Sequence, residues 1–309
     1  MSGLGAGLYP PEGRILHMVG ETKEDIDDYT SRVCAQGRCP MPAGASFHTN
    51  LSLIGIDRPN PLVPGDGEQD LMHLEKAHQD MAIHVALHLQ PPLLGAIVKG
   101  RLDPAIDQLA EKLSGLQRPV YLRIGCEFDA PHSEFHRTDY IEAYRRIVQR
   151  SGERGAHNIA YVWHSYAWLP TYEERDPLEW YPGDAFWPEY SNLPRLLEIA
   201  RQIRRPVMIC EASPLRITPD GSPPTTDGQE RWNKWFVPFF HLLTDRPEIR
   251  AFIISNCDWN TRKLTAGLGW GDCRIASDPL ILDRWCEELR REPYLHGCPG
   301  LYGSLSGAS

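Results

Sequence analysis

The chain has 309 residues, enough for one large domain, since a β/α barrel commonly takes about 250 residues. Hydrophobic residues make up 41% and charged residues 24%, as in globular proteins with a sizeable core, which excludes a largely disordered chain. The formal net charge of −9 argues against nucleic acid or an anionic membrane as a partner, because both reward clustered Lys and Arg. A neutral substrate fits this charge better.

The beginning of the chain, MSGLGAGLYPPEG, lacks the basic and apolar regions of a signal peptide. No window approaches the roughly 18 apolar residues of a membrane span. We therefore expect a cytoplasmic protein, or a secreted one whose leader has been removed.

Short apolar runs alternate with amphipathic stretches along the chain, which is typical of a parallel sheet covered by helices. Strands are predicted at 13–21, 43–52, 81–90, 118–127, 158–165, 204–212 and 249–259, with a poor candidate for the sixth strand at 184–191. Helices are predicted at 22–36, 68–80, 103–116, 137–152, 193–204, 227–244 and 278–291. The pattern predicts a (β/α)8 TIM barrel with an irregular sixth strand, a single domain over 1–309 with extended tails at 1–12 and 303–309.

The eight cysteines are too sparse for a disulfide scaffold, and no CxxC pair occurs. We expect buried thiols, although Cys34 and Cys39 could form a bridge in an oxidising compartment.

Two glutamates stand at the carboxyl ends of similar apolar runs: Glu127 in RPVYLRIGCE and Glu211 in RRPVMICEA. Side chains alternate along a strand, so Glu127 shares a face with Arg123, toward the barrel interior. On the second run, the same alternation predicts that Glu211 shares the inner face with Val207 and Ile209. The residues expected to face the helices are Val120, Leu122, Ile124 and Cys126 on the first run and Met208 and Cys210 on the second. Both glutamates would converge at one barrel mouth, where barrel enzymes keep their chemistry. The alternative is that each is an ordinary solvated charge.

Other polar and aromatic residues follow the predicted strands. Trp163 and Trp259 could stack on sugar rings, or belong to the core. His48 and His88, with His84, could line the mouth as hydrogen-bonding groups. A metal site of these histidines is disfavoured, since the first strand offers only His17 and no HxH pair. Asp129, Asp258 and Asp272 are candidates for substrate contact, or for capping turns.

Cofactor chemistry finds no support in the chain. None of the six lysines lies in a predicted strand, which disfavours a Schiff base. No Gly-rich phosphate loop or dinucleotide fingerprint follows a strand. We expect no cofactor and no metal.

Several motifs occur in a characteristic order: LRIGCEFDAP, NIAYVWHSYAW, WYPGD, PVMICEAS, FIISNCDWN and WGDCRIASD. In these the chain resembles the clan A glycoside hydrolases, most closely family 26. The resemblance implies a carbohydrate substrate and cleavage of β-glycosidic bonds with retention, with Glu127 as acid/base and Glu211 as nucleophile. Retention needs carboxyl groups about 5–5.5 Å apart. Arg123 could help to keep Glu211 ionised, or pair with another carboxylate.

The chain departs from the family pattern in two places. Cys126 stands where the family has Asn or His before the acid/base, and a thiol is a weak hydrogen-bond donor. The poor sixth strand normally supplies a group near the nucleophile, for which Tyr190, Tyr181 and Trp187 are substitutes. A carbohydrate-binding barrel that has lost catalysis is the alternative hypothesis. Mannan, xylan, β-glucan and arabinose-containing polymers all remain open as substrates.

Overall fold

A parallel sheet forms the centre of the molecule in the computed structural model, which describes residues 7–57, 59, 67–130, 133–165, 187–189, 193–214 and 227–306. The strands are β1 (Ile15–Gly20), β2 (Gly44–Thr49), β3 (Ala82–Leu87), β4 (Val120–Ile124), β5 (Ile159–His164), β6 (Trp187–Glu189), β7 (Val207–Ala212), β8 (Ile249–Ser255) and β9 (Tyr294–Leu295). Their order is β6-β5-β4-β3-β2-β1-β8-β7, with β9 beside β1, and every pairing among the named strands is parallel.

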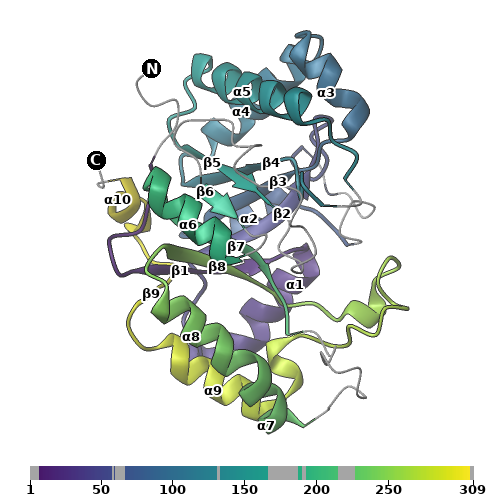
Figure 1. Ribbon diagram of the computed structural model, residues 1–309. Coiled ribbons are helices and arrows are strands. Elements are labelled where there is room, and N and C mark those ends of the chain that lie inside the picture. Colours follow the sequence, from purple (N-terminus) through teal and green to yellow (C-terminus); the bar gives the residue numbers. More distant parts are fainter. Residues whose placement is uncertain are drawn as a thin grey trace.

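Helices cover the outer face of the curled sheet (Figure 1). They are α1 (Lys23–Asp28), α2 (Leu71–Ala77), α3 (Pro91–Val98), α4 (Asp103–Gly115), α5 (Arg137–Glu153), α6 (Leu193–Ile203), α7 (Gly228–Arg231), α8 (Val237–Asp245), α9 (Pro279–Leu289) and α10 (Leu301–Ser306). The predicted helices are all present, but the sequence pattern missed α3 and α10. Residues 303–306 therefore belong to a helix and not to an extended tail. None of the described helices has the length and apolar character needed to cross a bilayer.

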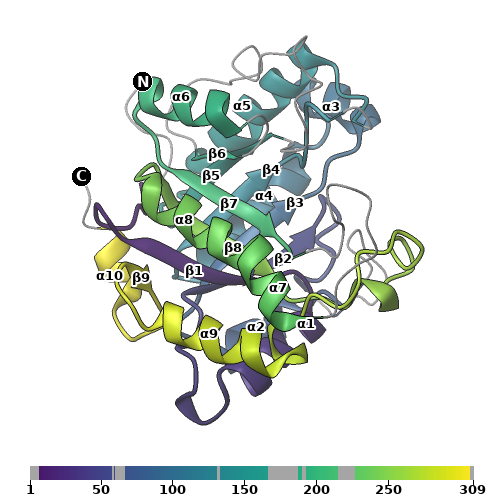
Figure 2. The same ribbon diagram turned by 60° about the horizontal axis from the view of Figure 1, so that its bottom comes forward.

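The sheet is curled but not closed within the described residues. Strands β6 and β7 are its two edges and lie next to each other in both ribbon views (Figures 1 and 2). No hydrogen-bonded ladder joins them among the residues that the structure describes. The prediction of a parallel α/β fold is confirmed, whereas closure of the sheet into a barrel stays a prediction.

Strand side chains alternate between two apolar clusters. One cluster lies between the sheet and the helices and takes Val120, Leu122 and Ile124 of β4, as predicted. The other fills the inside of the curl and takes Tyr121 of the same strand, together with Leu16 and other residues of the inner face. Arg123 is 1% exposed and lies on the inner face, above this second cluster.

On β7 the predicted alternation is wrong. Val207 and Ile209 lie in the cluster under the helices, while Met208 and Cys210 lie in the inner cluster. The register against β8 slips between Ile209 and Ala212, where β7 has one residue more than its partner. A bulge of this kind re-aims the side chains that follow it. The bulge lets the side chains of the two neighbours Cys210 and Glu211 both point inward, which strict alternation would not allow.

Candidate active site

Arg123 and Glu211 form an ion pair across the sheet. The Arg123 Nη1 lies 2.7 Å from the Glu211 Oε1, although the two residues come from β4 and β7. The guanidinium is 1% exposed and the glutamate side chain 39% exposed, so the carboxylate faces the opening and the arginine lies beneath it. The structure thus brings together two of the residues that the sequence singled out. A hydrogen bond between charged groups also fixes the direction of the carboxylate.

Glu127 lies in a turn beyond the end of β4 and not on the strand itself. Gly125 and Glu127 both have positive φ, 68° and 50°, so strand alternation cannot be carried through to this glutamate. A Cβ on Gly125 would meet the ring of Tyr140 at 2.9 Å, which requires glycine here. The backbone N–H of Glu127 donates to the Nδ1 of His164 at the end of β5, 2.9 Å away. A left-handed conformation at a residue other than glycine is uncommon and is often found at functional sites.

A third carboxylate, Glu21, directly follows β1. Its Oε1 accepts a hydrogen bond from the Ser255 hydroxyl (3.0 Å) and its Oε2 lies 3.3 Å from the Nε2 of His48. Burial acts to raise the pKa of Glu21, but the hydrogen bond and charge of His48, the charge of Arg123 and the Ser255 hydroxyl outweigh it and lower the pKa. Sequence reasoning missed Glu21, although MVGE ends a predicted strand just as the two other glutamates end theirs.

Glu21, His48 and Glu211 have the residue types and spacing of a metal site. One donor atom from each lies within 4.8 Å of the other two. A positive guanidinium already binds Glu211 at 2.7 Å and would repel a cation. The cluster therefore suits hydrogen bonding to a neutral substrate better than it suits metal binding.

Histidines from neighbouring strands surround Arg123. Burial, followed by the charge of Arg123, lowers the pKa of His84 and His164 well below the usual value. His88 is half-buried and its pKa is lowered by burial and by the charges of His48 and Arg123. The Nδ1 of His84 pairs with the Ser46 hydroxyl at 2.7 Å, so this ring supports the floor of the site.

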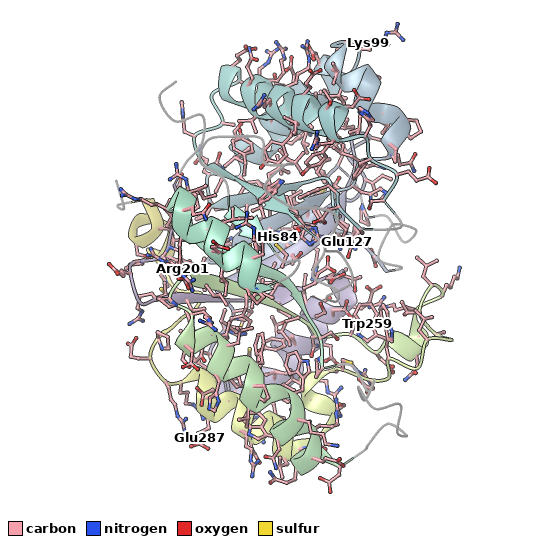
Figure 3. All side chains as sticks on the ribbon, in the orientation of Figure 1. His84, Lys99, Glu127, Arg201, Trp259 and Glu287 are labelled. Atoms are coloured by element: carbon pink, nitrogen blue, oxygen red, sulfur yellow. The ribbon has the colours of Figure 1, made fainter. Side chains whose placement is uncertain are left out.

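Trp259 follows β8 and lies at the same end of the sheet as Glu127 (Figure 3). Its indole N–H donates to the Ser213 hydroxyl (2.9 Å), two residues beyond Glu211, and its ring meets that of Trp270 edge-on at 5.3 Å. Asp258 caps the same turn by accepting the N–H of Asn260, which fits the structural reading of this aspartate.

The other residues predicted to contact the substrate differ in how well their positions fit that role. Trp163 is fully buried in the cluster under the helices and stacks on Phe128, so it presents no face to a sugar, and the prediction for it does not fit this position. Asp129 is buried and accepts the hydroxyl hydrogen of Ser165. Of Trp187 only the backbone is described, in β6. Tyr190 and Tyr181 lie outside the described residues, as does the WYPGD motif.

Comparison with known proteins extends over nearly the whole chain. It is 28% identical to a β-1,3-xylanase of a Vibrio species, covering 97% of this chain and 70% of the relative, and 26% identical to a β-1,3-xylanase of an Alcaligenes species, covering 96% and 68%. No family model matches. In fold it is similar to a GH26 β-mannanase from Bacteroides ovatus, with TM-score 0.63 and 17% identity over 94% of this chain and 93% of the other.

The chain is a glycoside hydrolase whose fold is similar to that of family 26. An endo-β-1,4-mannanase of Cellulomonas fimi has the same fold, with TM-score 0.60 and 17% identity over 94% of the enzyme and 74% of the mannanase. The enzyme thus has a curled parallel sheet of the kind found in these hydrolases, with acidic side chains at the carboxyl ends of its strands.

Proposed function

We propose that the enzyme hydrolyses a β-linked xylan with retention of configuration, with Glu211 as nucleophile and Glu127 as acid/base. In the first step a Glu211 oxygen bonds to the anomeric carbon, and the leaving oxygen takes the bond electrons and the proton of Glu127. In the second step Glu127 removes a proton from water, the water oxygen replaces Glu211 at that carbon, and the sugar is released.

The Arg123–Glu211 ion pair is the observation that supports these roles most directly. It holds one carboxylate oxygen and leaves the other oxygen of a 39% exposed side chain available for attack. Glu127 projects from a turn, and its backbone N–H donates to the Nδ1 of His164, a ring that burial keeps neutral. A proton donor needs a less cationic environment than a nucleophile does.

Xylan is favoured over mannan as substrate because the two relatives by sequence are β-1,3-xylanases. The mannanases resemble the enzyme in fold at 17% identity, which carries no information on the sugar. We therefore take β-1,3-xylan as the first substrate to test and β-1,4-mannan as its comparison.

We also infer that the sheet closes into a (β/α)8 barrel between β6 and β7. The supporting observation is that these two edge strands lie side by side (Figure 2). The similarity to the GH26 β-mannanase over 94% of the chain agrees with this inference.

The test measures release of reducing sugar from β-1,3-xylan by the wild-type enzyme and by Glu127→Gln and Glu211→Gln. Both substitutions keep side-chain size and remove an ionisable group, so we expect each to lower kcat by at least about 10³-fold. ¹H NMR of the first product should show the β-anomer before mutarotation. Glu12→Gln, an exposed glutamate in the lead before β1, is the matched control and should retain full activity.

Other outcomes are equally informative. A fully active variant of either glutamate would remove that residue from the mechanism. First formation of the α-anomer would indicate inversion. Binding of xylan without turnover, unchanged in Glu211→Gln, would support the carbohydrate-binding hypothesis instead.

A further inference from the structure

Glu21 has no role in the two-carboxylate mechanism, yet it lies beside the nucleophile. Its carboxylate is within 4.8 Å of donor atoms of both His48 and Glu211, and its side chain is only 10% exposed. Two hydrogen bonds, from Ser255 and His48, hold it in this position. A buried carboxylate is costly unless charged partners compensate for its burial.

Arg123 places a positive charge near both carboxylates. Arg123 contacts Glu211 directly, and its charge also lowers the pKa of Glu21. His48 contacts Glu21 through its Nε2, 3.3 Å from the Glu21 Oε2. Of the other rings close to Arg123, those of His84 and His164 on β3 and β5 are kept neutral by burial. Glu21 and Glu211 therefore share the positive charge of the Arg123 guanidinium. The charge of each carboxylate weakens the electrostatic attraction between Arg123 and the other carboxylate.

We propose that Glu21 is a positioning residue that keeps Glu211 basic enough to attack the anomeric carbon. Without Glu21, the charge of Arg123 would act on Glu211 without the opposing charge of Glu21, which makes a carboxylate a weaker nucleophile. When Glu211 becomes an ester in the covalent intermediate, its charge is lost, whereas the negative charge of Glu21 still acts on the buried Arg123. This inference rests on the proposed roles of Glu127 and Glu211.

The two chemical steps should respond oppositely to Glu21→Gln. Attack by Glu211 becomes slower because the carboxylate is less basic, and departure of Glu211 becomes no slower because a less basic carboxylate leaves more readily. We expect kcat/KM on β-1,3-xylan to fall by about three- to tenfold. The acid limb of the pH profile of kcat/KM, where activity falls as the pH decreases, should move to lower pH by about one unit.

Deglycosylation is measured separately with 2,4-dinitrophenyl β-xylobioside, whose activated leaving group makes the second step limiting. Its kcat should not fall in Glu21→Gln. Glu21→Asp restores the charge and should return the acid limb toward that of the wild type. Ser255→Ala removes a hydrogen bond of Glu21 without removing its charge, and should leave the acid limb in place.

A titration by ¹³C NMR of the Glu211 carboxyl tests the inference without catalysis. Its midpoint should move to lower pH in Glu21→Gln and stay unchanged in Glu12→Gln. An unchanged midpoint of the Glu211 titration would overturn the role of Glu21. So would an equal fall in the rates of both chemical steps together with an unchanged acid limb of the kcat/KM profile. The proposed function would still stand in that case, since it depends on Glu127→Gln, Glu211→Gln and the stereochemistry.

Discussion

Among the described residues, we propose Trp259 as the aromatic residue that meets a substrate ring. Its indole N–H is held by Ser213, and Trp270 packs edge-on against it, so the ring has a fixed orientation before any substrate binds. Both contacts come from segments that follow β7 and β8. An oriented aromatic ring loses little entropy when a sugar packs against it.

Replacement of Trp259 by alanine should therefore lower kcat/KM on β-1,3-xylan by about tenfold, the effect of losing one aromatic contact of about 1.4 kcal/mol. Trp259→Phe keeps a flat ring but loses the bond to Ser213, and should retain most of the activity. Steady-state kinetics of the two variants separate the roles of ring and N–H. If Trp259→Ala equals the wild type, the ring does not contact the sugar.

Among elements, β4 and β7 show what a strand pattern can and cannot predict. The alternation on β4 correctly placed Arg123 inside and Leu122 under the helices, because β4 is regular over its whole length. The same reasoning failed on β7, where a bulge adds one residue before Ala212. Glu127 stands beyond the last strand residue, in a turn that periodicity does not describe. The strands and helices were largely predictable from local sequence, whereas the direction of the glutamates depended on irregular backbone.

A buried chain of hydrogen bonds joins β1 to α9 and to the segment after β9. His296 donates through Nε2 to the Leu289 carbonyl, and its Nδ1 faces the Nδ1 of His17 at 3.4 Å. The Nε2 of His17 then accepts the hydroxyl hydrogen of Tyr29 (2.9 Å), whose oxygen accepts the indole N–H of Trp285 (2.6 Å). In this network each ring nitrogen of the two histidines either donates or accepts one hydrogen bond. This assignment, which follows from the network, holds only while both histidines are neutral.

Acid should therefore destabilise the fold. Burial lowers the pKa of His17, His84 and His164 well below 6.5, so the unfolded chain binds protons that the folded chain does not, and stability falls as pH drops below 6.5. Each of them contributes up to about 1.4 kcal/mol per pH unit. Below pH 6 the raised pKa of Asp25, about 6, acts in the opposite sense, since the folded chain then binds that proton first.

Urea unfolding at pH 7.5, 6.5 and 5.5 measures this dependence. The free energy of unfolding should decrease most between pH 6.5 and 5.5. His17→Gln, although less stable throughout, should show a slope smaller by about 1.4 kcal/mol per pH unit. A pH-independent free energy of unfolding would show that these histidines are not kept neutral by the fold.

For the whole molecule, the cysteines provide a test of the packing. All eight lie in described segments and none forms a disulfide; Cys298 is exposed, Cys126 is half-buried, and the others are buried. Cys34 and Cys39, which could have bridged, are both thiols here.

Reaction with Ellman's reagent should accordingly modify Cys298 rapidly, Cys126 more slowly, and the buried thiols only after denaturation, when the total reaches eight. Cys298→Ser should abolish the rapid phase. Dithiothreitol should leave the melting temperature unchanged. A total below eight, or a lower melting temperature after reduction, would reveal a disulfide.

The ion pair at the centre of the site joins residues 88 positions apart, and the hydroxyl that holds Glu21 comes from 234 positions further along the chain. Contacts between such distant parts form only after most of the loop-closure entropy has been overcome. A chain whose first half alone has folded holds Arg123 without Glu211 and Glu21 without Ser255. On the proposed mechanism, the polypeptide therefore remains inactive during synthesis until β7 and β8 have joined the sheet.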